Sequence, residues 1–97
     1  MSMEFRDLSL FYYKAKRSFE QCIQDSDNDF LKNEINIPVE EIIVVEKNIK
    51  IVFSRRAFES YLIEVSLSLF EVDKEIGRYL YVENDKKEGI DDSLVFY

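Results

Sequence analysis

Apolar and polar residues alternate through residues 59–71, and this alternation is the clearest pattern in the chain. The apolar positions are Tyr61, Ile63, Val65, Leu67 and Leu69, and Glu64, Ser66 and Ser68 stand between them. A period of two residues is typical of a β-strand that has one buried face and one exposed face. The pattern therefore predicts a long central strand whose apolar face the rest of the chain must cover.

Residues 3–24 follow a different period. Their apolar side chains recur every three or four residues, as expected for one face of an amphipathic helix. The stripe consists of Phe5, Leu8, Tyr12, Ala15, Phe19 and Cys22, widened by Phe11 and Ile23. We interpret it mainly as the surface that packs on the sheet, and a contact surface for a partner helix is the alternative.

Further strand-like runs precede and follow the central strand. Residues 40–46 are rich in β-branched side chains, Lys47-Asn48 has the length of a hairpin turn, and residues 49–53 then return as a second strand. A turn at residues 73–75 leads into a strand at 77–83. A charged loop, closed by Gly89 at positive φ, leads into a last strand at 93–97. The expected fold is α+β: one N-terminal amphipathic helix packed on an antiparallel β-meander of about five strands.

Length and composition restrict this fold to one domain, residues 1–97. Hydrophobic residues make up 46% of the chain, which is enough for a core of its own, and the formal net charge is −7. Free nucleic acid and anionic membranes are poor partners for such a charge, whereas a basic protein is a natural one. Cys22 is the only cysteine and no signal peptide or membrane span is visible, so we expect a cytoplasmic protein.

The residues needed for common catalytic sites are missing. The chain has no histidine, and Cys22 lies on the apolar helix stripe, so the usual nucleophile–base pairs cannot be assembled. The carboxylate pairs Glu40/Glu41 and Asp91/Asp92 are interpreted as solvated. The acidic run at residues 25–29 resembles the start of a calcium loop, but Phe30 and Asn36 replace the glycine and glutamate that such a loop requires. We therefore predict no enzyme activity, no cofactor and no metal site.

Negative charge is unevenly distributed along the chain. Residues 1–24 carry a net charge of +1 and the remainder −8. Acidic residues near the C-terminus neighbour tyrosines, which are favoured at protein interfaces, although the face that bears Tyr79 and Tyr81 can equally belong to the core. The alternative is a charged surface that serves only solubility. The partner-binding residues predicted from this pattern are Tyr79, Tyr81, Glu83, Asp85, Glu88, Asp91, Asp92 and Tyr97.

The C-terminal segment IGRYLYVENDKKEGIDDSLVFY resembles the tail of some immunity proteins of bacterial contact-dependent growth inhibition and related polymorphic toxin systems. The resemblance rests on a glycine, an aromatic strand, an acidic turn, two aspartates and a short apolar strand. The matching positions are Gly77, Tyr79, Tyr81, Asp85, Gly89, Asp91, Asp92 and residues 94–96. It implies a small cytosolic protein that binds one cognate toxin, with a nuclease as the expected class, and blocks its basic active site.

Two other functions share part of this evidence. A phage-encoded inhibitor of a host defence complex would mimic nucleic acid through carboxylates spaced like phosphates. A small structural or adaptor protein would use the helix stripe or an exposed sheet edge as its contact, and would form a homodimer or bind a scaffold protein.

Overall fold

The computed structural model describes residues 5–25, 38–54 and 57–97. It contains one α-helix, one short 3-10 helix and four strands. In chain order these are α1 (Phe5–Gln24), η2 (Val39–Glu41), β1 (Ile43–Ser54), β2 (Ala57–Glu71), β3 (Lys74–Asn84) and β4 (Gly89–Phe96).

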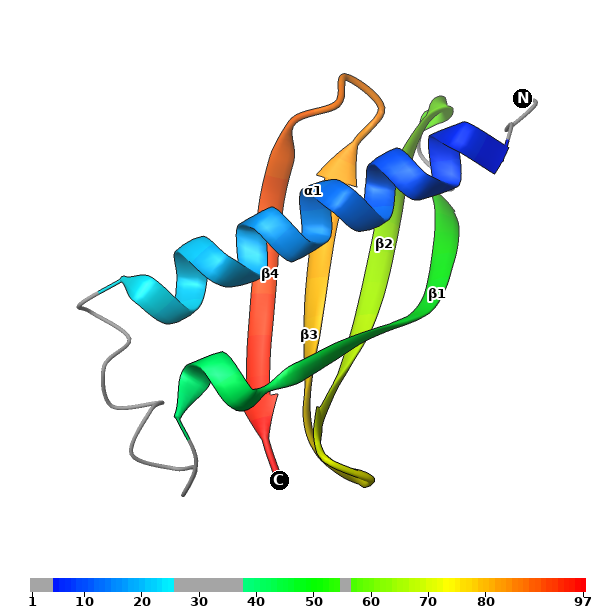
Figure 1. The fold of residues 1–97 in the computed structure, drawn as a ribbon. Helices are drawn as coiled ribbons and strands as arrows, with labels where there is room; N and C mark the ends of the chain where they lie inside the picture. Colours follow the sequence, from blue (N-terminus) through cyan, green and yellow to red (C-terminus); the bar gives the residue numbers. More distant parts are fainter. Residues whose placement is uncertain (1–4, 26–37, 55–56) are drawn as a thin grey trace.

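The strands form one antiparallel sheet in the order β1-β2-β3-β4, so each strand pairs with its neighbour in the chain. The helix α1 crosses one face of this sheet diagonally (Figure 1). This two-layer arrangement agrees with the predicted α+β class and with a helix that covers an antiparallel meander.

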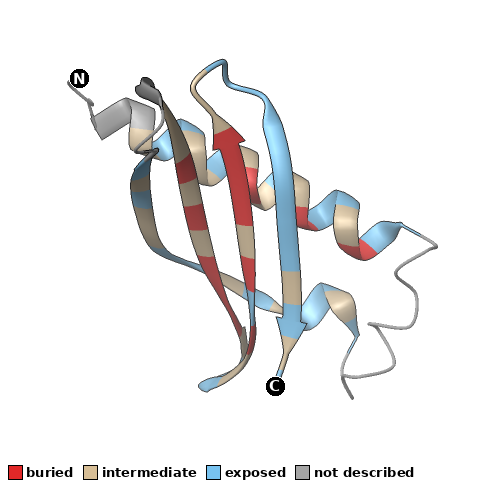
Figure 2. Ribbon diagram, turned by 180° about the vertical axis from the view of Figure 1, so that it is seen from behind, coloured by how far each residue is buried: buried red, intermediate tan, exposed pale blue. Residues whose placement is uncertain are grey.

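The core lies between α1 and the two central strands. Buried side chains recur at every second position of β2 and β3 and along one stripe of α1, as the two sequence periods predicted. Figure 2 shows this burial on α1, β2 and β3, whereas β4 is largely exposed. The core consists of Ala15, Phe19 and Ile23 from α1, Ile63, Val65, Leu67 and Leu69 from β2, and Tyr79 and Tyr81 from β3.

The strand β1 is continuous where the sequence predicted two strands. The predicted hairpin at Lys47-Asn48 is wrong: Glu46 and Asn48 lie opposite adjacent residues of β2, and Lys47 is the extra residue of a β-bulge. A type I′ hairpin turn needs positive φ at both turn residues, and neither Lys47 nor Asn48 has it. The sheet therefore has four strands rather than five.

The two hairpin turns also differ in detail from the prediction. The β2–β3 turn consists of Val72 and Asp73, one residue earlier than expected, and Val72 has a φ of 55°. In the β3–β4 loop it is Lys87, with a φ of 67°, that adopts positive φ, and not Gly89. Gly89 instead permits close packing, because a Cβ there would lie 3.2 Å from the ring of Tyr81, which is a tight contact.

The face of the sheet opposite α1 has no second layer among the described residues. Four β-branched side chains on this open face are between 38% and 49% exposed: Ile43, Val45, Val52 and Val95. They alternate or pair with polar residues that include Lys50, Glu64, Ser66 and Arg78. The open face is thus mixed in character, whereas the helix-covered face is largely apolar.

Candidate functional site

The predicted binding residues fall on β3, β4 and the loop that joins them. The loop is organised by the side chain of Asn84, whose Oδ1 accepts hydrogen bonds from the backbone N–H groups of Lys86 and Glu88 at 2.9 and 3.0 Å. The backbone N–H of Lys87 donates to the Asn84 carbonyl at 3.1 Å, and that of Asn84 donates to the Glu88 carbonyl at 3.0 Å. The loop therefore has a defined shape before any partner binds.

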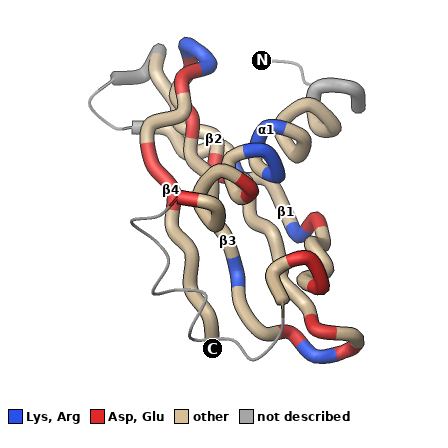
Figure 3. The backbone as a smooth tube through the Cα atoms, turned by 60° about the vertical axis from the view of Figure 1, so that its left-hand side comes forward, with Lys and Arg blue, Asp and Glu red and all other residues tan. Residues whose placement is uncertain are grey.

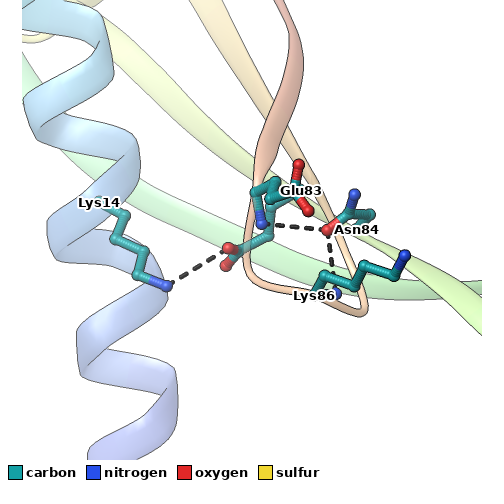
Figure 4. Close-up of polar contacts among 5 residues, drawn as sticks. Lys14, Glu83, Asn84 and Lys86 are labelled. Carbon is teal, nitrogen blue, oxygen red and sulfur yellow. Dashed lines mark hydrogen bonds and ion pairs between the residues drawn. The ribbon is translucent and has the colours of Figure 1, made fainter.

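Directly beneath this loop, Glu83 points toward the helix. Its side chain is completely buried, and its Oε2 lies 3.3 Å from the Nζ of Lys14 on α1 (Figure 4). The second oxygen, Oε1, is buried and has no hydrogen-bond partner among the described residues. Lys14 also lies over the ring of Phe11, 5.8 Å from its centroid. A buried carboxylate with one ion pair depends strongly on that single partner.

A second polar connection joins α1, β3 and β4 through the hydroxyl group of Tyr79. This hydroxyl donates to Asp92 Oδ2 at 2.8 Å, and it therefore accepts from the Ser18 hydroxyl at 2.5 Å. Cys22 forms a side-chain hydrogen bond with the same carboxylate. The ring of Tyr79 packs edge-on against Phe19, with centroids 5.5 Å apart. The chain of bonds fixes the helix across two strands.

The environment raises the pKa values of these groups. Burial is the main cause for Tyr79, with a further contribution from the Asp92 carboxylate, while the hydrogen bond from Ser18 acts in the opposite direction. The pKa of Tyr81 is raised by burial and by the nearby Glu83. The pKa of the Cys22 thiol is raised by burial and by Asp92, which keeps it in the weakly nucleophilic thiol form.

The remaining predicted carboxylates are not buried. Glu88, Asp91 and Asp92 are exposed and Asp85 is half-buried. We call Asp85, Glu88 and Asp91 the outward carboxylates, because none of them forms an ion pair within the described part of the chain. Lys86 and Lys87 lie in the same loop. Figure 3 shows further acidic positions at η2 and at the β2–β3 turn, so this group is one of several.

The structure therefore divides the predicted binding residues into two sets. Tyr79, Tyr81 and Glu83 are at most 9% exposed and lie beneath α1, so they support the fold and do not form a surface. The exposed or half-buried set consists of Asp85, Glu88, Asp91, Asp92 and Tyr97, with Tyr97 68% exposed. The tyrosine face belongs to the core, which was one of the two interpretations that the sequence allowed.

The hollows on the described part of the surface include two that the sequence pattern did not predict. A groove of about 530 Å³ runs between α1 and the start of β1, with Phe19, Ile23, Val39, Ile42 and Val44 among its lining residues. A shallower hollow of about 290 Å³ on the open face is lined by residues that include Lys47, Lys50, Glu64 and Arg78. Each brings together residues from elements that are distant in the sequence, which periodicity does not reveal.

The sequence also raised the questions of a metal site, an acidic calcium-like loop and a membrane span. In the part of the chain that the structure describes, no three Cys, Asp or Glu side chains are grouped to hold a metal ion. The acidic run at 25–29, apart from Asp25, lies outside the described residues. No helix within the described ranges is both long and apolar enough to cross a membrane.

Comparisons with known proteins find no match to this chain among protein-family models, curated proteins or solved structures.

Proposed function

We propose that this chain is an immunity protein that binds and neutralises a cognate bacterial toxin, expected to be a nuclease, in the cytoplasm. The observation that supports it best is the set of outward carboxylates at one end of the sheet, held on a structured loop and on the strand that follows. Carboxylates in this position are complementary to the lysines and arginines that bind substrate phosphates in a nuclease active site.

The proposed mechanism is occlusion. The outward carboxylates increase the rate of encounter with a cationic surface, and contacts made afterwards hold the complex together. Ile90 supplies exposed apolar area beside them, at 51% exposure, whereas Tyr97, which is 68% exposed, lies at the opposite end of β4 (Figure 1). Buried apolar and aromatic contacts contribute most of the affinity of such complexes, while charged residues at the rim mainly affect association rate and specificity.

The direct test is co-expression with the toxin encoded by the adjacent upstream gene. We expect the chain to protect growth, to co-purify with the toxin at a fixed stoichiometry and to inhibit its activity in vitro. A chain that neither binds nor protects would exclude this function.

A charge-reversal pair makes the test specific for the site. Asp85→Lys, Glu88→Lys and Asp91→Lys together are expected to weaken binding at least tenfold. Asp92 is left unchanged, because it accepts the hydrogen bond from buried Tyr79. The matched control reverses three exposed acids elsewhere, Glu40, Glu71 and Asp73, and changes the net charge equally. If both variants lose the same amount of binding, the net charge of the chain, and not the position of these carboxylates, determines toxin binding.

The open face of the sheet favours a second candidate function, that of a small adaptor subunit. Its exposed β-branched side chains resemble an unfilled contact surface more than a fully solvated sheet face. This alternative predicts a homodimer or a larger assembly of the purified protein, which light scattering measures directly. A monomer that binds the toxin through the outward carboxylates would favour the first proposal.

A further inference from the structure

The sheet has two edge strands, and they differ in how they are protected. Among the described residues, β1 pairs only with β2, and β4 pairs only with β3. An unpaired strand edge presents backbone N–H and C=O groups that can pair with another chain, and proteins usually block such an edge.

The β1 edge carries two recognised protective features. A β-bulge interrupts the strand at Lys47, near its middle, and both Lys47 and the nearby Lys50 are exposed. Bulges and edge lysines both disfavour the addition of another strand. The sequence of β4 contains no lysine, arginine or proline, and its register shift lies at Ile90, next to the hairpin loop.

The register identifies the backbone groups that β4 directs away from β3. The N–H of Tyr97 donates to the Ile76 carbonyl at 2.9 Å, so Tyr97 directs its backbone groups toward β3. Pairs alternate along an antiparallel ladder, and Ser93 and Val95 therefore also face β3. The intervening residues Asp92, Leu94 and Phe96 direct their N–H and C=O groups away from β3. The N–H of Asp92 donates to Asp91 Oδ1 at 2.9 Å, so the outward N–H groups available to another strand are those of Leu94 and Phe96. These outward-facing residues recur about every 6.8 Å along β4. The residues of an added strand that pair with them recur at the same interval.

Charge selects between the candidate occupants of this edge. Asp91 and Asp92 give β4 a charge of −2 with no compensating cation in the strand. A second copy of the chain would bring two acidic strands together, which is unfavourable. A strand with lysine or arginine at alternate positions would instead place opposite charges across the new pair of strands, which is stabilising.

We propose that the β4 edge binds an extended basic segment of the partner protein by β-strand addition, through the backbone N–H and C=O groups of Leu94 and Phe96 and the C=O group of Asp92. The inference rests on the proposed function only for the basic character of the partner. It adds a binding mode in which main-chain hydrogen bonds supply affinity and the aspartates select a cationic strand.

The test uses an N-acetylated peptide of eight residues with alternating lysine and valine as the probe, and backbone amide hydrogen exchange measured by NMR. At saturating peptide we expect exchange at Leu94 and Phe96 to slow at least tenfold. Amides of Ser93 and Val95, already bonded to β3, serve as internal controls and change little. This alternating pattern is specific for strand addition, because electrostatic attraction alone does not distinguish odd from even positions.

Two control peptides separate pairing from charge. One has the same sequence with every backbone nitrogen methylated, so that it retains its charge but has no N–H group to donate to the ladder. The other replaces every lysine by glutamate. We expect at least tenfold weaker binding for both. No binding of the original peptide, equal binding of the methylated peptide, or protection of β1 amides instead would each overturn the inference.

A protein variant gives an independent measurement. Leu94→Pro removes an outward N–H while the bonds between β4 and β3 remain, and we expect at least tenfold weaker peptide binding. Thermal unfolding shows whether the variant folds. If it does not fold, the exchange pattern of the unchanged protein alone decides the inference. Toxin neutralisation without strand addition would leave the proposed function intact, whereas strand addition without neutralisation would refute the function alone.

Discussion

The β3–β4 hairpin carries carboxylates in two different environments. Glu83 and Asp92 point toward α1, where one pairs with Lys14 and the other accepts from Tyr79. The outward carboxylates Asp85, Glu88 and Asp91 form no ion pair within the described residues. Acidic residues that look alike in the sequence therefore have separate roles, and their position relative to the sheet faces decides which role each has.

The largest expected effect is the loss of the partner of Glu83. Lys14→Met leaves a fully buried carboxylate without its cation, and we expect the free energy of unfolding to fall by about 2–3 kcal/mol. This is less than for a fully enclosed pair because the Lys14 side chain is 27% exposed. Urea denaturation measures the change.

The control for this prediction is a second lysine on the same helix. Lys16 forms an ion pair with Glu46 at 2.7 Å, but both side chains are at least 40% exposed. Lys16→Met should therefore cost less than about 1 kcal/mol. The double variant Lys14→Met/Glu83→Leu should recover most of the lost stability, since no unpaired charge remains. Equal costs for the two lysine variants would contradict the assignment of Glu83 as a structural group.

The next prediction compares adjacent aspartates. Asp92→Ala removes the acceptor of the Tyr79 hydroxyl and should cost about 1–2 kcal/mol of unfolding free energy. Asp91→Ala removes an exposed carboxylate and should change stability by less than about 0.5 kcal/mol. Chemical denaturation of both variants under the same conditions provides the measurement. If the Asp91 variant were the less stable one, the distinction between carboxylates that point toward α1 and outward carboxylates would be wrong.

Stability should also depend on pH through the inward groups. Because the pKa of Tyr79 is raised in the folded protein from its ordinary value of 10.0, the unfolded chain releases this proton first. The stabilisation is therefore complete below pH 10 and decreases as the pH rises above it, by about 1 kcal/mol at pH 11. Tyr79→Phe should show a shallower decline between pH 9 and 11 in denaturation curves. An unchanged slope would show that this tyrosine does not titrate differently in the two states.

The sequence predicted the layers of this fold better than its connections. The two-residue period of β2 and the apolar stripe of α1 identified the core. Burial of one face imposes the first period on a strand and the second on a helix. The bulge at Lys47 was missed, because strand-like residues precede and follow it. A single inserted residue between two such runs looks like a turn in the sequence. For the binding residues, acidity identified the hairpin, but the inward direction of Glu83 depends on a lysine sixty-nine positions away. No local pattern contains that information.

The smallest expected effect on stability belongs to the outward carboxylates. The isosteric variant Asp85→Asn/Glu88→Gln/Asp91→Asn should alter the free energy of unfolding by less than about 0.5 kcal/mol, because none of the three forms an ion pair among the described residues. Association with the toxin should nevertheless slow, and its rate should become less sensitive to salt, because steering by exposed charge is screened by ions. Stopped-flow measurements at two ionic strengths test this, with Glu40→Gln/Glu71→Gln/Asp73→Asn as the control of equal charge. If the two variants slow association equally, total charge attracts the partner. If only the hairpin variant slows it, the partner approaches the end of the sheet where β4 begins.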